Sequence, residues 1–597
     1  MKMTRRIAQL GLIVISLFSV AATYCYGQNR QPNVLLILAD DMGYNDLGFI
    51  NHQQTVTPTL DKLAANGISF SRHYTDSTCS PSRVALLTGM NPAKLGFHPE
   101  GLALPNDIVT LPQLLKDNGY RTYLFGKWHA GDLITDASPD KHGFDHWFGM
   151  LSHFYLAGIT RNGHQVASTP AYLNPWLQSE NSAPQQYQGH IDDLLTAKAI
   201  DTIRQKEATP WFIYVPFLSP HTPTIPNDKF RAKYPDTPNG RYRAVIEQLD
   251  SNIAALLAAV EGAGERDNTI VIFLSDNGAT SKFFPSNDPF SGSKASYDEG
   301  GIRTPLIVYW PKHWQGGNQI SEPKYIADVY PTIAQALGLQ VPRNIDGESI
   351  FKQRKTPIYW YSQAPSRDSF SILSTDGRWR LLGDGNSSQL LYYADAKSAP
   401  APKVNAAVQA KLNHQFISWR DSVTTLISGG KHPSKAGSLS IATPFRPTFS
   451  LGFSFLAPSP IGANPISLID SRQLKLSYQP GEFVLNIDST VLKIPYQLSS
   501  QCNSIYLNFF VAQDNTIFYG DGKSTIDLYV NGNPPSRAEF KIDRINDPNF
   551  SELKLRDFIA QPSGQIFSSS IEIASRAFLN DEIERNMAKQ KKDYCPH

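Results

Sequence analysis

Along the first two thirds of the chain, short apolar runs alternate with segments of helical periodicity. Five of these runs are dense in Val, Ile, Leu or aromatic residues, as strands buried on both faces are. They are residues 33–39, 120–125, 211–217, 269–274 and 306–310. Strands that alternate with helices are typical of parallel sheets, because a parallel neighbour is reached through a crossover helix. The pattern predicts an α/β region in which a mostly parallel sheet is flanked by helices.

The helices between these runs have recognisable ends. A Thr-Pro pair at residues 57–58 opens one helix, which Gly67 closes, and a Leu-Pro pair at residues 111–112 opens another, which Gly119 closes. A longer amphipathic stretch covers residues 242–260. Ligands of open α/β sheets bind beyond the carboxyl ends of the strands. Functional side chains are therefore expected directly after each strand.

Four of the predicted strands are followed by side chains with ligand or acid–base chemistry. Each motif has an ordinary explanation when it stands alone: paired aspartates often form a solvated turn, Asp-Asn-Gly is a common tight turn, and most single histidines are not catalytic. Their recurrence at four strand ends favours a functional site. The side chains are, in chain order, Asp40 and Asp41, Lys127 and His129, His221, and Asp276 and Asn277.

The aspartates Asp40, Asp41 and Asp276, together with Asn277, offer only oxygen ligands. Ca²⁺ prefers such ligands and Zn²⁺ does not. Three carboxylates without a cation would repel one another, whereas a divalent ion neutralises them and polarises an anionic substrate oxygen. We therefore expect calcium at this edge of the sheet, with magnesium as the alternative.

Residues 79–83 read Cys-Ser-Pro-Ser-Arg and lead into an apolar stretch that Gly89 closes. The segment predicts a cysteine on a turn that enters an amphipathic helix. Such a placement directs helix N–H groups at an anion bound over Cys79, and Arg83, one turn into the helix, adds a planar cation. Taken alone, the segment is equally compatible with a small buried thiol before a helix.

This segment closely resembles the signature of the formylglycine-dependent sulfatases, a family of alkaline phosphatase-like fold. In that signature, a separate maturation enzyme converts the cysteine to formylglycine. The resemblance covers about residues 32–395, and its motifs occur in the family's order. Its further parts are Gly-Ser-Lys at residues 292–294, Glu-Gly-Gly-Ile-Arg-Thr-Pro at 299–305, Asp-Val-Tyr-Pro-Thr at 328–332, Asp-Gly at 346–347, and Asp-Gly-Arg-Trp at 376–379, which resembles the start of the family's small C-terminal sheet. One slight departure is Ala130, where the family commonly has Leu.

The resemblance implies a role for each site residue. Formylglycine at position 79, hydrated to a diol beside the metal, would attack sulfur through one hydroxyl and form a covalent sulfate ester. Its second hydroxyl would then expel sulfate. The metal would be held by Asp40, Asp41, Asp276, Asn277 and modified Cys79; Arg83, Lys127 and Lys294 would bind sulfate oxygens and the nucleophile; His221 would donate to the leaving alcohol; and His129 would be the base for the elimination.

The expected substrate is a sulfated carbohydrate derived from a polysaccharide. Phosphonate monoester and phosphodiester hydrolases share the fold, metal set and signature, so a phosphoester substrate is the first alternative. A catalytically silent glycan-binding protein is the second, although none of the expected catalytic residues is missing. His98, His153 and His190 are candidate substrate contacts and equally well plain surface residues.

The N-terminus has the composition of a secretion signal. Three basic residues within positions 1–6 precede an apolar run over residues 7–22, which is too short to span a bilayer comfortably. We expect residues 1–27 to be a signal peptide and the protein to be exported, either periplasmic or secreted. Tyr24 is too bulky for the residue before a lipid-modified cysteine, which argues against acylation of Cys25. The formal net charge of +2 indicates no nucleic-acid or membrane footprint.

Three cysteines remain beyond the leader: Cys79, Cys502 and Cys595. An odd number in an exported protein indicates that one thiol is left over or is used chemically. Cys502 and Cys595 are both C-terminal and could pair in an oxidising compartment.

The composition changes after the catalytic region, which we place at residues 28–428. Residues 429–442 form a Gly/Ser/Lys-rich linker, and residues 443–597 alternate as antiparallel strands do. The predicted strands are residues 451–456, 474–478, 483–487, 504–511 and 525–530. The Asp-Leu-Tyr-Val-Asn-Gly run at residues 527–532 and the segment 575–583 resemble a laminin-G or concanavalin-like jelly roll. Such a β-sandwich could bind glycans or merely pack beside the catalytic region.

Overall fold

The computed structural model describes most of the first 423 residues and the strands that follow. The predicted signal peptide, His98, His153, Cys595, the segment 575–583 and most of the predicted linker lie outside the described residues. The described ranges are 30–95, 97, 104, 108–131, 138–151, 172–182, 184–205, 208–280, 284–364, 367–384, 387–395, 401–423, 441–444, 448–456, 465–470, 474–487, 490–498, 502–510, 524–531, 536–540, 552–555 and 572–574. Within these ranges, no helix has the length and apolar character needed to cross a lipid bilayer.

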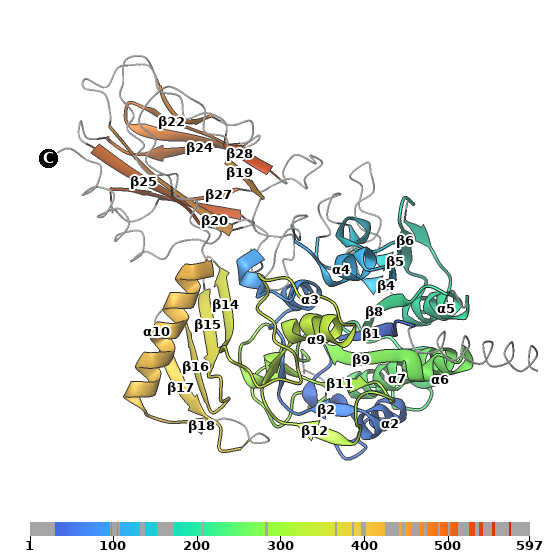
Figure 1. The fold of residues 1–597 in the computed structure, drawn as a ribbon. Helices are drawn as coiled ribbons and strands as arrows, with labels where there is room; N and C mark the ends of the chain where they lie inside the picture. The colour runs from blue at the N-terminus through green and yellow to red at the C-terminus, as the bar shows by residue number, and fades with distance from the viewer. Residues whose placement is uncertain are drawn as a thin grey trace, which may run out of the picture.

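A ten-stranded sheet forms the centre of the fold, in the order β12-β2-β11-β9-β1-β8-β4-β5-β6-β7 (Figure 1). Its inner five strands are parallel, and four of them are strands that their apolar sequences predict; β5 was not predicted. In spatial order they are β9 (Thr269–Ser275), β1 (Asn33–Asp40), β8 (Trp211–Pro220), β4 (Arg121–Lys127) and β5 (His146–Met150). The side chains of β1 are buried on both faces, so this strand lies at the heart of the core.

The sheet is mixed rather than mostly parallel, because its outer strands run in both directions. The strand predicted at residues 306–310 forms as β11 (Leu306–Tyr309), but it is antiparallel to β9. The reason lies in the connection from β9, whose two ends lie together at the carboxyl edge: the Gly278 N–H donates to the Gly301 carbonyl at 2.9 Å. A strand that enters from that edge must run back along its neighbour. The other outer strands are β2 (Ile68–Phe70), β12 (Asn318–Ile320), β6 (Trp176–Ser179) and β7 (Gln185–Gln186).

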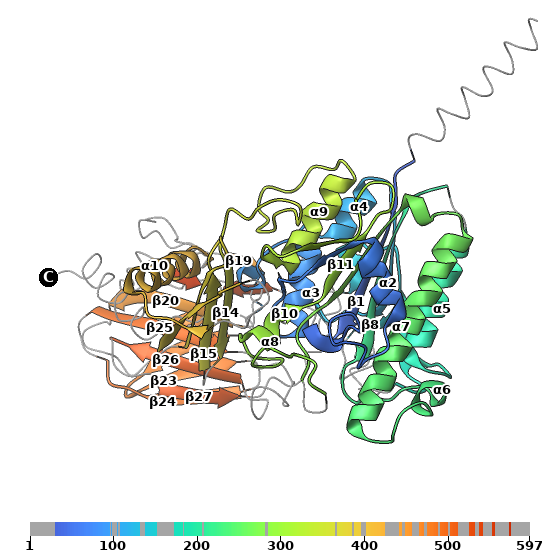
Figure 2. The same cartoon turned by 90° about the horizontal axis from the view of Figure 1, so that it is seen from below.

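Helices cover both faces of this sheet (Figure 2). One face packs against α2 (Pro58–Asn66), α5 (Ile191–Arg204) and α7 (Pro238–Gly262). The other packs against α3 (Cys79–Thr88), α4 (Leu111–Asp117) and α9 (Val329–Ala336). α7 begins four residues before its predicted start, because Thr237 caps it by accepting a hydrogen bond from the Gly240 N–H at 3.1 Å. α3 ends at Gly89, whose φ of 67° suits a residue without a side chain.

A small antiparallel sheet follows the central one, as the Asp-Gly-Arg-Trp motif predicts. It contains β14 (Ile358–Ala364), β15 (Arg367–Leu373), β16 (Trp379–Asp384), β17 (Ser388–Tyr392) and β18 (Ala401–Pro402). Helix α10 (Ala406–Val423) packs on it through Leu412 and Phe416. A separate three-stranded sheet contains β10 (Arg303–Thr304), β3 (His73–Tyr74) and β13 (Lys324–Tyr325).

Beyond residue 440 the described residues are all in antiparallel strands or their turns. The five strands predicted there form as β20, β22, β23, β25 and β26. Their bounds and those of their neighbours are β19 (Ile441–Pro444), β20 (Thr448–Leu456), β21 (Ile466–Asp470), β22 (Leu474–Gln479), β23 (Glu482–Ile487), β24 (Thr490–Pro495), β25 (Cys502–Phe510), β26 (Ser524–Val530), β27 (Ser536–Phe540), β28 (Glu552–Leu555) and β29 (Glu572–Ala574). They indicate an all-β region; the jelly-roll likeness stays a prediction.

A buried ionic cluster joins the small sheet to α8 (Glu299–Ile302) and to the three-stranded sheet. Glu299, at the start of α8, accepts hydrogen bonds from Arg303 at 3.0 Å and from Arg380 of β16 at 2.9 Å. The hydroxyls of Tyr74 and Tyr393 donate to the same carboxylate at 3.3 and 2.5 Å. Although burial alone would raise the pKa of Glu299, the charges on Arg303 and Arg380 lower it, so the group is ionised.

We predict that Glu299→Ala destabilises the protein by roughly 3–5 kcal/mol, because two buried guanidinium groups lose their counter-ion. Urea denaturation of the full chain measures this loss. A suitable control is Asp236→Ala, since Asp236 is exposed and pairs with the surface residues Arg231 and Arg241. A loss for Glu299→Ala no larger than that for Asp236→Ala would show that the cluster has no structural role.

Candidate active site

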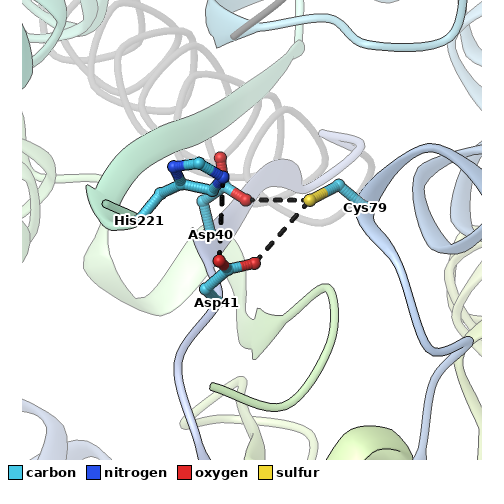
Figure 3. A group of neighbouring side chains, drawn as sticks. All are labelled: Asp40, Asp41, Cys79 and His221. Carbon is cyan, nitrogen blue, oxygen red and sulfur yellow. Dashed lines mark hydrogen bonds and ion pairs between the residues drawn. The ribbon is translucent and has the colours of Figure 1, made fainter. Parts of the chain in front are cut away.

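The carboxyl edge of the central sheet gathers a cysteine, two aspartates and a histidine (Figure 3). Asp40 ends β1 and Asp41 follows it, Cys79 begins α3, and His221 follows β8. The Cys79 Sγ lies 3.2 Å from Asp40 Oδ1 and 3.7 Å from Asp41 Oδ1, and His221 Nε2 lies 3.7 Å from Asp41 Oδ2. All four side chains are buried, and their ligating atoms lie within 4.8 Å of one another.

Asp276 and Asn277 join this group because β9 lies beside β1 in parallel register. Ala39 is paired with Ser275, so the next residues of both strands emerge together. Asp276 Oδ1 accepts a hydrogen bond from the Asp41 N–H at 3.1 Å, and Asn277 Nδ2 donates to Asp41 Oδ1 at 2.7 Å. Both side chains are fully buried.

Three cations surround the three carboxylates. Lys127 Nζ lies 2.6 Å from Asp40 Oδ2, and Lys294 Nζ lies 2.7 Å from Asp41 Oδ1 and 3.1 Å from the Cys79 sulfur. Arg83 donates hydrogen bonds to Asp276 Oδ2 from Nε at 3.0 Å and from Nη2 at 2.8 Å. The Nη1 atom of Arg83 donates to the Lys127 carbonyl oxygen at 2.8 Å. The cluster therefore brings together every sequence-predicted acid and cation, in balanced charge.

The burial of these groups and their proximity to like and unlike charges shift the pKa of several of them. Burial would raise the pKa of Asp40, but the nearby Lys127 ammonium and the other cations hold it well below its usual value. Burial, reinforced by repulsion from Asp40, raises the pKa of Asp276 to about 6 in spite of Arg83. Burial and the charges on Asp276 and Asp40 raise the pKa of the Cys79 thiol well above its usual value. An unmodified Cys79 is therefore a neutral thiol and a poor nucleophile.

Both predicted catalytic histidines lie in this site and are neutral. Burial and the Lys294 charge lower the pKa of His221 to about 4, and burial and Lys127 lower that of His129 well below its usual value. The Thr222 carbonyl, 2.5 Å from His221 Nδ1, can only accept a hydrogen bond. Neutral His221 therefore carries its proton on Nδ1 and presents the Nε2 lone pair toward Asp41.

The donor set fits a hard divalent cation. Asn277 Oδ1 is buried and accepts no hydrogen bond within the described part of the chain, although such an oxygen normally has a partner. It lies beside three carboxylates, which is the ligand chemistry of calcium. A thiol suits calcium poorly, whereas an oxygen-bearing derivative of Cys79 at the same position would match the other donors.

One candidate substrate contact is not at this site, and one supporting residue was missed. His190 is buried at the start of α5, where Nδ1 accepts from the Asp192 N–H at 3.3 Å and Nε2 contacts the Ile225 carbonyl at 3.0 Å. It therefore has a structural role. Tyr172, which no motif indicates, donates from its hydroxyl to the backbone carbonyls of Leu218 and His221 and thus holds the loop that carries His221.

Comparisons with known proteins agree with this geometry. The sulfatase family model matches residues 32–339. The chain is 32% identical over 388 residues to N-acetylgalactosamine-6-sulfatase of Mus musculus, covering 59% of this chain and 72% of that protein. It is 33% identical over 336 residues to arylsulfatase J of Mus musculus, covering 54% of this chain and 55% of that protein.

A solved structure of similar fold is that of Ps i-CgsB in complex with k-i-k-neocarrahexaose. It has a TM-score of 0.58 and 27% sequence identity, and the match covers 65% of this chain and 93% of that chain. With the signature at Cys79 and the balanced cluster around it, these matches establish that the chain belongs to the sulfatase family and is a sulfuric ester hydrolase.

Proposed function

We propose that this sulfatase removes sulfate from sulfated carbohydrate, using formylglycine made from Cys79 and a bound calcium ion. The observation that carries the proposal is the position of the Cys79 sulfur, between two carboxylates at 3.2 and 3.7 Å and the Lys294 ammonium at 3.1 Å. The carbohydrate substrate is supported by the names of similar proteins, which include an N-acetylgalactosamine-6-sulfatase and a protein solved with neocarrahexaose.

Calcium would be held by oxygens of Asp40, Asp41, Asp276 and Asn277, with residue 79 as a further ligand. When bound, it would supply Lewis-acid polarisation of a sulfate oxygen and neutralise the surrounding carboxylates. The cluster alone is balanced, with three aspartates against Arg83, Lys127 and Lys294. The divalent ion would give the site an excess of positive charge, which suits the anionic sulfate ester.

Hydrated formylglycine would supply two hydroxyls on one carbon, one to attack sulfur and one to release sulfate. Lys127 and Lys294 would bind the oxygens around sulfur; both are buried, Lys294 contacts the Cys79 sulfur, and Lys127 contacts Asp40 beside it. Arg83 would orient Asp276 through its two hydrogen bonds and add positive charge to the site. These fixed cations would stabilise the charge that builds up as the S–O bond breaks.

His221 would protonate the leaving oxygen through Nε2. Its Nδ1 is already bonded to the Thr222 carbonyl, so a proton gained at Nε2 points into the site. In the metal-free protein, burial and the Lys294 charge lower the pKa of His221 to about 4. The negative charge of a bound sulfate ester would favour the protonated form. His129, kept neutral by burial and by Lys127, would accept the proton of the second hydroxyl.

The proposal includes one protein partner. A formylglycine-generating maturation enzyme would act on the signature segment, and export would follow from the signal peptide. We further propose that the all-β region, whose described strands pair antiparallel, is a laminin-G-like module. Such a module could increase affinity for polymeric substrate.

We predict that Cys79→Ala abolishes turnover of an aryl sulfate, because no diol can form at an alanine. In protein from a host that performs the maturation, mass spectrometry should find the residue 79 peptide about 18 Da lighter than its thiol form. An active sample with only unmodified peptide would contradict the nucleophile assignment. Turnover of an aryl phosphonate ester but not of the sulfate would favour the phosphonate hydrolase alternative.

We predict that His221→Ala affects substrates according to their leaving group. An aryl sulfate with an acidic phenol needs little protonation, so kcat should fall by about tenfold or less, whereas a sugar sulfate should lose about 100-fold or more. Steady-state kinetics on both substrates measure the difference. Equal losses on both would show that His221 is not the acid.

We predict that calcium affinity falls as the pH drops below about 6. Asp276 has a raised pKa of about 6 in the metal-free protein, so below that pH calcium must displace a proton from it. Above it the carboxylate is already ionised, and affinity is constant. The dissociation constant, measured by calorimetry, should rise toward about tenfold per pH unit. Asp276→Asn should bind more weakly but lose this dependence; an unchanged dependence would assign the titration to another group.

A further inference from the structure

The connection between Asn277 and Lys294 is folded back on itself around a buried asparagine, Asn287. This side chain is only 3% exposed, although it lies in a turn and not in a strand or helix. A buried amide with both donors and acceptors needs specific partners, because an unsatisfied one is costly. Its hydrogen bonds therefore show which backbone segments it holds.

Asn287 binds the backbone of both ends of the connection. The Ala279 N–H donates to Asn287 Oδ1 at 3.0 Å, and Asn287 Nδ2 donates back to the Ala279 carbonyl at 2.9 Å. The same Nδ2 donates to the Gly292 carbonyl at 3.3 Å. The Ala279 carbonyl also accepts from the Lys294 N–H at 3.1 Å. The side-chain amide thus pairs with one peptide group as a neighbouring strand would.

The two segments carry different parts of the active site. Ala279 is two residues after Asn277, whose amide and Asp276 are proposed calcium ligands. Gly292 is two residues before Lys294, whose ammonium contacts Asp41 and the Cys79 sulfur. Asn287 is therefore near the loops that are proposed to bind the calcium ion and the sulfate group.

The loop after β1 packs against the same turn. A side chain on Gly43 would approach the Asn287 Oδ1 to 2.6 Å, so Gly43 lies directly against this amide. The Asn45 N–H donates to the Ser286 carbonyl at 2.6 Å. The turn thus contacts all three loops that supply the aspartates, the asparagine and Lys294.

We propose that Asn287 is a positioning residue that sets the distance between the calcium ligands Asp276 and Asn277 and the catalytic Lys294. The inference rests on the proposed function, since it assumes that these groups bind calcium and sulfate. Lys294 must reach the same reacting atom as the cation, and displacements well under 1 Å are enough to impair catalysis. An irregular connection has no ladder to hold it, and the Asn287 amide supplies equivalent hydrogen bonds.

The test is Asn287→Ala in the matured full-length protein. We expect the calcium Kd, measured by calorimetry without substrate, to rise about tenfold or more, as loss of supporting hydrogen bonds around a metal site does. At saturating calcium, kcat on an aryl sulfate should also fall about tenfold, because Lys294 is no longer held. In a Lys294→Ala background the same change should lower kcat much less. Should Asn287→Ala fail to fold, Asn287→Ser, which keeps a small polar group, serves for the same measurements.

Asn33→Ala is the matched control. Asn33 is also a buried asparagine that joins two segments, since its Oδ1 accepts from the Trp211 N–H at 3.1 Å and its Nδ2 donates to Glu265 at 3.2 Å. It lies at the start of β1, at the opposite edge of the sheet from the site. We expect it to lower Tm and to leave the calcium Kd and kcat within about twofold of the wild type.

Two results would overturn the inference in distinguishable ways. If the Asn287 variant lowers Tm but keeps the wild-type calcium Kd and kcat, as the control does, Asn287 is only structural and the proposed function stands. If the wild-type matured protein itself binds no calcium, the proposed function fails and the inference fails with it.

Discussion

The charge balance at the carboxyl edge of the central sheet is the constraint on which the rest of the molecule depends. Asp40, Asp41 and Asp276 are taken out of water within a few ångströms of one another, and each contacts a fixed cation. Removing one member of such a set leaves an uncompensated buried charge, which costs more than the pair contributes. The strand order, the start of α3 at Cys79 and the long connection to Lys294 can all be understood as ways of bringing these groups together.

Much of the fold could be predicted from the sequence, because its strands are apolar and its helices are punctuated. The five strands and four helices predicted in the catalytic region all form, with ends that differ by a few residues. The direction of β11 could not be predicted, since an apolar run of four residues reads the same in either orientation. Only the position of the preceding connection decides it, and that connection returns to the edge where β9 ends, as the hydrogen bond from the Gly278 N–H to the Gly301 carbonyl shows.

Some residues of the candidate site could be predicted from the sequence, and others could not. Acids and cations after strand ends could be identified because topology brings those ends together. Residues that act through backbone contacts could not. Tyr172 and Asn287 lie in segments without a motif, and their roles appear only once the chain has folded around them. His190 shows the reverse case: its residue type suggested chemistry, but its hydrogen bonds are those of a helix cap.

The burial of Cys79 has a consequence for the order of events in biosynthesis. Its side chain is 1% exposed, so another enzyme cannot reach the sulfur once α3 has packed. Any enzymatic conversion must therefore compete with folding. Asp276, which pairs with Arg83 of the signature, and Lys294, which contacts the Cys79 sulfur, leave the ribosome long after residue 79. The late arrival of these partners gives a nascent chain an interval in which the signature is still accessible, and a variant that folded faster there would shorten it.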